Sequence, residues 1–360
     1  ELAYKKGFYE GVMILGSQSG KRVEEAKVAA QQEMIDAGEA FLYYEPNGQV
    51  ISRSGDECVV TFSDQWYLTY GEKDWQQPVM QYIREKLETF NPKTKQALEA
   101  SCDWLSSWAC SRQFGLGTRL PWDPQFLIES LSDSTIYMAY YTIAHLLQGD
   151  LFGETVGPLG IEADKMSPEV HDYVFCEGKY PENCGIPQEK LDKLRHEFLY
   201  WYPFDLRVSG KDLIKNHLMM CLYNHQAIWP DMTKMPKAFF CNGHVQLNNE
   251  KMSKSTGNFL TVDDAIKQFG ADATRFACAD AGDSLDDANF AIATANAAIL
   301  SLTTEEDFIQ SVMSGELATV EKAESEYNFF DRTFINEMND CVRRADAAYH
   351  DMHFRDALQI

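Results

Sequence analysis

The 360-residue sequence contains no paired-thiol motif, no long apolar run and little positive charge. Its nine cysteines are scattered from Cys58 to Cys341 without a Cys-x-x-Cys spacing. This pattern disfavours a disulfide framework and a thiolate zinc site, and it favours a reducing compartment. The most apolar stretch, 136–147, is interrupted by Thr142 and His145 and is shorter than the roughly 20 residues that a bilayer requires. We therefore expect no membrane-spanning helix.

The charge balance is strongly acidic. Lysine and arginine number 32 against 55 aspartates and glutamates, which gives a formal net charge of −23. Such an excess opposes nonspecific binding to nucleic acid or to an anionic membrane, so any polyanionic partner must meet a local cationic patch. The composition is that of a globular protein, and the length predicts two or more packed units. The first residue is not methionine and no apolar signal segment follows it, so we expect a piece of a longer polypeptide.

Apolar periodicity predicts an α/β chain that continues into helices. We expect β-like runs at 49–53, 57–62, 204–208 and 239–247. We expect helices over 23–37, 75–90, 93–108, 135–147, 189–198, 211–227 and 262–269. Residues 123–131 should form a loop or short helix, 149–188 an irregular insertion, and the chain after 284 should be almost wholly helical. Gly38 should end the first helix, Ser209 and Asp212 have capping-box spacing, and Thr261 and Gly270 should bound the helix over 262–269.

The sharpest feature is the string Lys251-Met252-Ser253-Lys254-Ser255, between an expected strand and a capped helix. Two ammonium groups three residues apart on flexible stems suit a mobile cover over a polyphosphate, because they can follow charge that develops on phosphate oxygens. Met252 would give such a loop an apolar anchor. The alternative is a solvated hairpin tip with two ordinary lysines, which the complete string disfavours.

The string resembles the signature loop of the class I aminoacyl-tRNA synthetases, and its surroundings are similar to one group of that family. Residues 202–218, Tyr-Pro-Phe-Asp-Leu-Arg-Val-Ser-Gly-Lys-Asp-Leu-Ile-Lys-Asn-His-Leu, resemble a strand and helix of the cytosolic leucyl-tRNA synthetases of eukaryotes and archaea. Ser111-Arg112-Gln113, residues 129–141 and residues 270–275 resemble further segments of their catalytic domain. The resemblance extends over nearly the whole chain.

The resemblance implies the second half of a Rossmann-like class I catalytic domain, followed by the start of an all-α domain. Residues 1–45 would be the tail of an editing insertion domain, 46–290 the C-terminal half of the catalytic domain with connecting insertions, and 291–360 the start of a helical anticodon-binding domain. The implied activity is a cytoplasmic leucine–tRNA ligase that forms leucyl-adenylate from leucine and ATP and acylates tRNA(Leu). Mg²⁺ would arrive with ATP, and members of a multi-synthetase complex are further candidate partners.

The resemblance also implies three groups of site residues. The catalytic group would stabilise charge on the pyrophosphate side, with the serines as loop donors: Lys251, Lys254, Ser253 and Ser255. The nucleotide-binding group would place Gly210 under the adenine and Asp212 on the ribose hydroxyls, with Asn216, His217 and Met252 beside them. The leucine group is Ser134, Thr135 and Tyr137. A buried helical histidine is an equally supported alternative for His217, and plain helix core is the alternative for the leucine group.

The sequence departs from the family in its first half. No His-x-Gly-His spacing occurs among the eight histidines, so we expect these 360 residues alone to make no adenylate. No protein metal ligand is assigned, because Cys58 has no His beside it and Mg²⁺ prefers phosphate oxygens and water. We interpret Asp283, Asp286 and Asp287 as a solvated helix start.

Two other functions stay open. One is a noncatalytic leucine-sensing or scaffold protein derived from a synthetase. The other is an isoleucyl- or valyl-tRNA synthetase relative, since a pocket distinguishes one methylene by only about 1–3 kcal/mol. Amino-acid competition in an ATP–pyrophosphate exchange assay would separate these possibilities.

Overall fold

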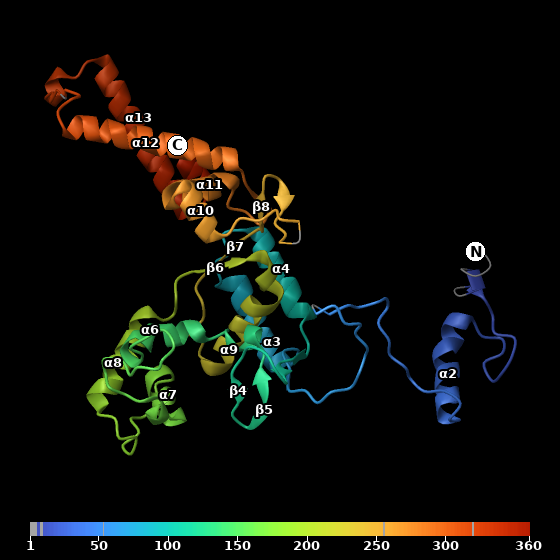
Figure 1. The fold of residues 1–360 in the computed structure, drawn as a ribbon. Coiled ribbons are helices and arrows are strands. Elements are labelled where there is room, and N and C mark those ends of the chain that lie inside the picture. The colour runs from blue at the N-terminus through green and yellow to red at the C-terminus, as the bar shows by residue number, and fades with distance from the viewer. Residues whose placement is uncertain (1–5, 8–9, 53, 255, 319) are drawn as a thin grey trace. The chain divides into compact units, whose positions relative to one another are not determined.

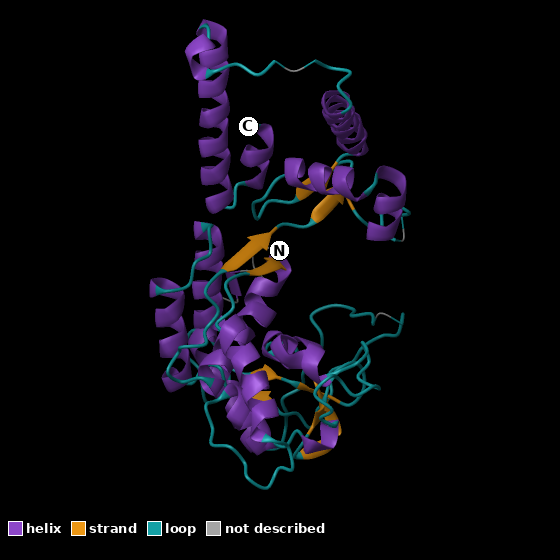
Figure 2. Ribbon diagram, turned by 90° about the vertical axis from the view of Figure 1, so that its left-hand side faces the viewer, coloured by secondary structure: helices purple, strands orange, loops and turns teal. Residues whose placement is uncertain are grey.

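The computed structural model describes residues 6–7, 10–52, 54–254, 256–318 and 320–360. The chain divides into two compact units, Glu1–Asp64 and Gln65–Ile360, and each is described by itself (Figure 1). Across the described residues the strands are short and helices make up most of the regular structure (Figure 2). No helix formed by these residues is both long and apolar enough to cross a bilayer.

The first unit contains helix α2 (Val23–Asp36), as the periodicity predicts. Gly38 follows it with φ +71°, so the predicted glycine stop is confirmed. The predicted strands at 49–53 and 57–62 do not form as strands. A single antiparallel bridge, Ile51 to Glu57, joins the two segments, and Arg53 lies outside the described residues. The side chains here are largely exposed, and a lone two-stranded hairpin without a buried face gains too little burial to extend its ladder.

The second unit begins with a small sheet and two helices. Strand β1 (Tyr67–Leu68) pairs antiparallel with β2 (Trp108–Ala109), and helices α3 (Lys73–Glu85) and α4 (Pro92–Trp104) lie between them. Both helices end earlier than predicted. Glu88 leaves the helix because it forms a parallel bridge with Ala238, and the chain after α4 extends to join β2.

Residues 123–128 are a strand, so the predicted loop or helix is wrong there. Strand β5 (Asp123–Ile128) is the middle of an antiparallel sheet, with β3 (Ser111–Arg112) on one side and β4 (Arg119–Leu120) on the other. Its ladder depends on partners elsewhere in the chain, which local periodicity does not reveal. The short helix α5 (Ser130–Asp133) follows.

Helices α6 (Tyr137–Leu147), α7 (Pro168–Phe175) and α8 (Gln188–Trp201) form a subdomain with its own core (Figure 1). Helices α6 and α8 confirm the predictions. The predicted irregular insertion 149–188 also contains α7 and the 3₁₀ turn Ala163–Lys165. Ser167 begins α7 by accepting a hydrogen bond from the Val170 N–H at 3.4 Å.

The central element is a parallel strand pair. Strand β6 (Arg207–Gly210) pairs with β7 (Phe239–Asn242), and a helical run connects them: a 3₁₀ turn (Lys211–Leu213), a π-turn (Ile214–Leu218) and α9 (Met219–Ile228). The core against α3 and α4 includes the buried residues Tyr70, Val79, Ile83, Leu98, Leu218, Met219, Tyr223 and Phe239.

The predicted capping box at the start of this run is wrong. Ser209 and Gly210 pair with β7 and so belong to the strand. The Ser209 hydroxyl donates to the Gly210 carbonyl at 3.3 Å, and Gly210, which has no side-chain cap, occupies the N-cap position. The strand ladder therefore displaces the local capping pattern.

A second small sheet carries the signature string. Strand β8 (Val245–Leu247) pairs parallel with β10 (Ala288–Phe290) and antiparallel with β9 (Glu250–Lys251). The predicted strand 239–247 is therefore two strands, β7 and β8. Strand β10 is a further exception to the predicted helical C-terminal region.

The remaining elements are helical, which confirms the predicted α/β class with helices after it. Helix α10 (Val262–Phe269) is capped by Thr261, whose hydroxyl accepts from the Asp264 N–H at 3.1 Å, and it ends at Gly270 with φ +81°. The elements after it are α11 (Ala271–Ala281), α12 (Ile292–Met313), a 3₁₀ turn (Glu324–Glu326), α13 (Phe329–His350) and α14 (Phe354–Gln359). Helix α14 packs against α11.

Candidate functional site

The signature string begins on the hairpin of β8 and β9. Asn248 and Asn249 connect the strands with φ of 50° and 67°, as a two-residue turn with both φ positive requires. The Asn248 N–H donates to the Phe290 carbonyl at 3.1 Å, and the Asn248 side-chain oxygen accepts from the Ile292 N–H at 3.2 Å. The hairpin is thus fastened to β10 and to the start of α12, and Lys251 ends β9.

The loop after β9 is closed by its own backbone. The Ser253 N–H donates to the Asn258 carbonyl at 2.8 Å, and Gly257, with φ +75°, donates to the Lys254 carbonyl at 3.3 Å. Met252 packs against the apolar cluster that includes Leu247, which agrees with the anchor expected for it. Ser255 lies outside the described residues, and its role as a loop donor stays a prediction.

Both lysines of the string are exposed. Among the ion pairs formed by the described residues, none involves Lys251 or Lys254. Their ammonium groups are therefore available to an anionic group that approaches the hairpin.

The proposed nucleotide side lies where β6 ends. A Cβ on Gly210 would fall 2.6 Å from Asp212 Oδ1, so the glycine leaves room for that carboxylate. Asp212 is exposed, and its Oδ1 lies 3.8 Å from His244 Nε2. Asn216 is half-buried, and its side-chain oxygen accepts from the His217 N–H at 2.6 Å.

Arg207 gathers three of the predicted residues into one group, which we call the Arg207 cluster: Arg207, Ser134, Tyr137 and His217. The guanidinium Nη2 donates to the Tyr137 hydroxyl at 2.5 Å and to His217 Nε2 at 3.1 Å. Its central carbon lies 5.0 Å from the centre of the Tyr137 ring, within cation–π range. His217 Nδ1 lies 3.3 Å from the Ser134 hydroxyl.

His217 is a neutral imidazole in this arrangement. Burial lowers its pKa, the hydrogen bond to the Leu131 carbonyl opposes that effect, and the Arg207 charge lowers the pKa further. Nδ1 lies 3.3 Å from that carbonyl, which can only accept, so Nδ1 carries the proton and Nε2 accepts from Arg207. The ring orients its neighbours without adding positive charge.

Thr135 is placed apart from the Arg207 cluster. It is fully buried, its hydroxyl donates to the Ser132 carbonyl at 2.8 Å, and it accepts from the Asn224 amide of α9 at 2.7 Å. Both hydrogen-bonding functions of the hydroxyl are therefore used inside the core. This geometry favours the plain-core interpretation of Thr135 over contact with leucine.

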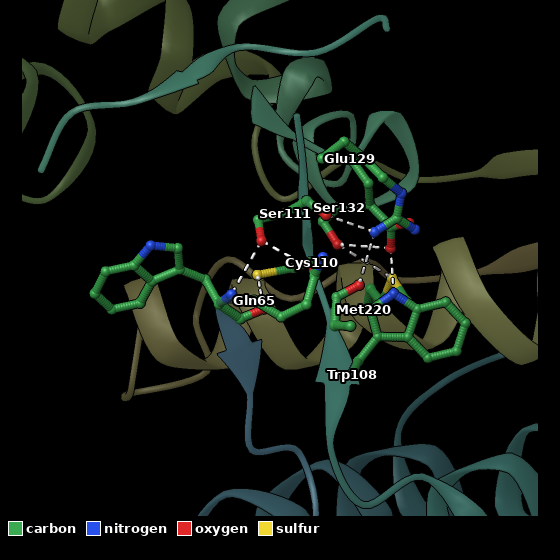
Figure 3. A network of polar contacts seen from close by, with 10 residues as sticks. Gln65, Trp108, Cys110, Ser111, Glu129, Ser132 and Met220 are labelled. Atoms are coloured by element: carbon green, nitrogen blue, oxygen red, sulfur yellow. Dashed lines mark hydrogen bonds and ion pairs between the residues drawn. The ribbon is translucent and has the colours of Figure 1, made fainter. Parts of the chain in front are cut away.

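Sequence reasoning missed the buried carboxylate of Glu129. Figure 3 shows it beside Trp108 and Ser132. Glu129 is 6% exposed and accepts from the Trp108 indole N–H, from Arg112 Nη2 at 2.5 Å and from the Ser132 hydroxyl at 3.3 Å. The network satisfies a charge that would otherwise be costly to bury, and it holds α5 against β3. The signal available in the sequence was only that Arg112 and Glu129 both lie in family-like segments.

The acidic residues at 283–287 are not a solvated helix start, so that interpretation is wrong. Asp287 precedes strand β10, accepts from Lys211 Nζ at 2.6 Å and accepts from the His244 N–H at 2.9 Å. These two hydrogen bonds, that of Lys211 foremost, lower the pKa of Asp287. Asp283 accepts from the Arg355 N–H at 3.0 Å. In the part of the chain that is described, no group of three or more His, Cys, Asp or Glu side chains could hold a metal ion.

Comparison with known proteins places this geometry in a family. The family model of class I tRNA synthetases (M) matches residues 191–340. The putative cytoplasmic leucine–tRNA ligase of Schizosaccharomyces pombe is 53% identical over 361 residues, which cover 100% of this chain and 32% of that protein. The cytoplasmic leucine–tRNA ligase of Pongo abelii is 51% identical over 362 residues, which cover 100% of this chain and 30% of that protein. The chain thus spans about a third of the length of these relatives.

A solved structure supports the fold. Methionyl-tRNA synthetase of Mycobacterium tuberculosis, in complex with methionyl-adenylate, superposes with a TM-score of 0.59 at 15% sequence identity. The match covers 88% of this chain and 54% of that chain. At this identity the likeness concerns the fold alone, and it confirms the predicted class I architecture. The chain therefore has the class I aminoacyl-tRNA synthetase fold, and along its whole length it is a homologue of cytoplasmic leucine–tRNA ligases, to which it is about 50% identical.

Proposed function

We propose that the whole protein containing this chain is a cytoplasmic leucine–tRNA ligase that activates leucine with ATP and transfers it to tRNA(Leu). The observation that carries this proposal is the identity of about 50% along the entire chain to proteins of that name. The geometry supports it, because Lys251 pairs with Gln246 of β8 and Asp212 lies 3.8 Å from His244, the residue that precedes β8. Members of a multi-synthetase complex stay predicted partners.

The hairpin lysines would act on the pyrophosphate side. When the leucine carboxylate attacks the α-phosphorus of ATP, the bond to the bridging oxygen breaks and negative charge moves to the leaving pyrophosphate. The exposed ammonium groups of Lys251 and Lys254 would stabilise that charge, with Ser253 and Ser255 as loop donors. Mg²⁺ would arrive with the phosphates, since it prefers their oxygens and water to protein cages.

The end of β6 would take the nucleoside. Asp212 is exposed and can accept from the ribose hydroxyls. Gly210, close to Asp212 in the chain, has no side chain, so the adenine could approach its backbone closely. Asn216 and His217 follow on the same helical run. Met252 would support the site indirectly, because its side chain anchors the signature loop to the apolar cluster that includes Leu247.

The Arg207 cluster would form part of the leucine side. The Tyr137 and Ser134 hydroxyls meet around a neutral His217 and a charge-bearing Arg207, so the cluster offers polar groups that can orient an amino acid. Thr135 would support this group from the core. We further propose the division into 1–45, 46–290 and 291–360 as parts of the editing, catalytic and anticodon-binding domains.

The test is ATP–pyrophosphate exchange by the full-length protein with leucine, isoleucine and valine offered separately and in competition. We expect exchange that depends on leucine and is weak with the other two. Exchange driven by isoleucine or valine would replace the proposed substrate. Absence of exchange with all three would favour a noncatalytic protein.

A further inference from the structure

The carboxylate of Asp287 connects the two segments that carry the proposed nucleotide site. Its Oδ1 accepts from Lys211 Nζ at 2.6 Å and from the His244 N–H at 2.9 Å. Lys211 lies between Gly210 and Asp212 at the end of β6, and His244 directly precedes β8 of the signature hairpin. One side chain therefore ties the nucleoside turn to the base of the hairpin.

The backbone around Asp287 makes this connection rigid. Lys211 Nζ also donates to the Leu285 carbonyl at 3.2 Å, and the Ala288 N–H donates to the His244 carbonyl at 3.0 Å. Gly243 approaches so closely that a Cβ on it would lie 2.2 Å from the Asp286 carbonyl oxygen. Residues 243–244 and 285–288 are thus packed backbone against backbone, and the Lys211 ammonium group binds the second of these segments.

The His244 ring lies between two carboxylates. Its Nδ1 is 3.6 Å from Asp287 Oδ1, and its Nε2 is 3.8 Å from Asp212 Oδ1. Among the ion pairs of the described residues, His244 is the partner found for Asp212. The Asp212 carboxylate therefore lies next to a ring whose own backbone N–H is held by Asp287.

We propose that Asp287 is a positioning residue, which acts through Lys211 and His244 to set the Asp212 carboxylate and the base of the hairpin for the ATP substrate. This inference rests on the proposed function. Asp287 does not itself contact ATP in this proposal. The Lys211 and Asp287 side chains are 34% and 36% exposed, so their ion pair contributes little to stability. We expect loss of this ion pair to weaken ATP binding, with little change in the free energy of unfolding.

The experiment compares Asp287→Ala and Asp287→Asn with Asp286→Asn in the full-length protein. Asp286 is the matched control, because its side chain makes no hydrogen bond or ion pair with another described residue. We expect Asp287→Ala to raise the KM for ATP about tenfold, the effect expected when a misplaced Asp212 carboxylate loses one hydrogen bond to the ribose. Asp287→Asn should raise it less, because an amide oxygen still accepts from the His244 N–H. The KM for leucine and kcat should stay within about twofold of wild type.

A second variant tests the same contact from its other end. Lys211→Met should raise the KM for ATP, and the Lys211→Met, Asp287→Asn double variant should raise it less than the two single effects combined. Additive effects, an unchanged KM in Asp287→Ala, or an equal change in Asp286→Asn would overturn the proposal. Thermal unfolding of each variant excludes a loss of fold as the cause.

The two proposals fail separately. If the wild-type protein shows no leucine-dependent exchange, the proposed function fails. Calorimetric titration of the same variants with ATP alone still tests the role of Asp287. We expect weaker ATP binding in Asp287→Ala than in wild type, and unchanged ATP binding in Asp286→Asn. If exchange is normal and ATP binding is equal in both variants, only the positioning role is lost.

Discussion

Two exposed lysines and two buried histidines of this protein differ in their electrostatic surroundings. Lys251 and Lys254 are exposed and stand apart from the ion pairs of the described residues, so their charge is free to act. His217 and His225 are buried, and each ring has both nitrogens in hydrogen-bonding contact, so burial keeps them neutral. The two lysines bear on chemistry, and His225 bears on stability.

The lysines give a direct prediction. Lys251→Ala and Lys254→Ala in the full-length protein should each lower kcat of leucine-dependent exchange about 100-fold, because each removes a charge aimed at the leaving pyrophosphate. Lys267→Ala is the control: it is exposed on the neighbouring α10 and pairs with Asp263 one helical turn away. Exchange should be unchanged in that variant. Equal rates in all three variants would remove the lysines from the mechanism.

The burial of His225 leads us to predict that the stability of the protein depends on pH. It is completely buried, Nε2 accepts from the Tyr202 hydroxyl at 2.8 Å, and Nδ1 donates to the Cys221 carbonyl at 2.8 Å. Burial lowers its pKa to about 4. Since the unfolded chain binds this proton more readily, stability is fully present above the unfolded pKa of about 6.5 and is lost as pH falls toward 4.

The free energy of unfolding should therefore fall by up to about 2 kcal/mol between pH 6.5 and pH 5, at 1.36 kcal/mol per pH unit. Urea unfolding at several pH values measures it. A His225→Asn variant should be less stable and show a smaller slope. Part of the slope should remain, because His217 also has a lowered pKa. An unchanged slope in His225→Asn would assign the effect to other groups.

At the scale of elements, the strands come into place through close backbone contacts. Gly243 lies between β7 and β8, and a Cβ there would meet three backbone atoms: the Asp286 carbonyl oxygen at 2.2 Å, the Asp286 carbonyl carbon at 2.5 Å and Asp287 Cα at 2.9 Å. None of these atoms can move without shifting β10. The register of the small sheet thus depends on the absence of a side chain at this position.

Gly243→Ala should destabilise the protein by about 1–3 kcal/mol, the usual effect of overpacking, and should raise the KM for ATP. Gly48→Ala is the matched control, because a Cβ there meets nothing within 4 Å. Chemical denaturation and exchange kinetics measure both effects. Equal stability of the two variants would mean that the backbone at 284–288 yields easily.

Element predictions succeeded where the signals were local. The helices α2, α6, α8 and α10 were predicted from periodicity, with the Gly38 and Thr261 termini in place. Predictions failed where strands pair at a distance. Strand β5 was missed because its partners are β3 and β4, and the capping pattern at Ser209 gave way to the ladder with β7. A strand exists only through its partner, which a local pattern does not specify.

At the scale of the whole molecule, the net charge is −23, and few accessible cationic side chains lie near the proposed ATP and leucine sites. Lys211 is paired with Asp287, and Arg207 is enclosed by Tyr137 and His217. Lys251 and Lys254 keep their charge available. The acidic surface elsewhere would discourage nonspecific contact with RNA, so recognition of tRNA would depend on local contacts.

The isolated 360-residue chain should make no adenylate. The sheet that carries the end of β6 consists, within the described residues, of β6 and β7 only, and the sequence has no His-x-Gly-His element. Half a nucleotide site cannot hold the reacting groups in line. Leucine-dependent exchange should be absent in the chain and present in the full-length protein at equal concentration. Exchange by the chain alone would show that these residues suffice.

The amino-acid sequence by itself determined the family, the α/β class, the locally signalled helices and the lysine hairpin, because these depend on residues close together in the chain. The tertiary structure alone decided which side chains meet. Arg207 joins Tyr137 across 70 residues, and Lys211 joins Asp287 across 76. Such contacts require that strand pairing and core packing first bring distant segments together. For this reason Asp287, which the sequence placed in a solvated helix start, instead connects the turn after β6 to the base of the signature hairpin.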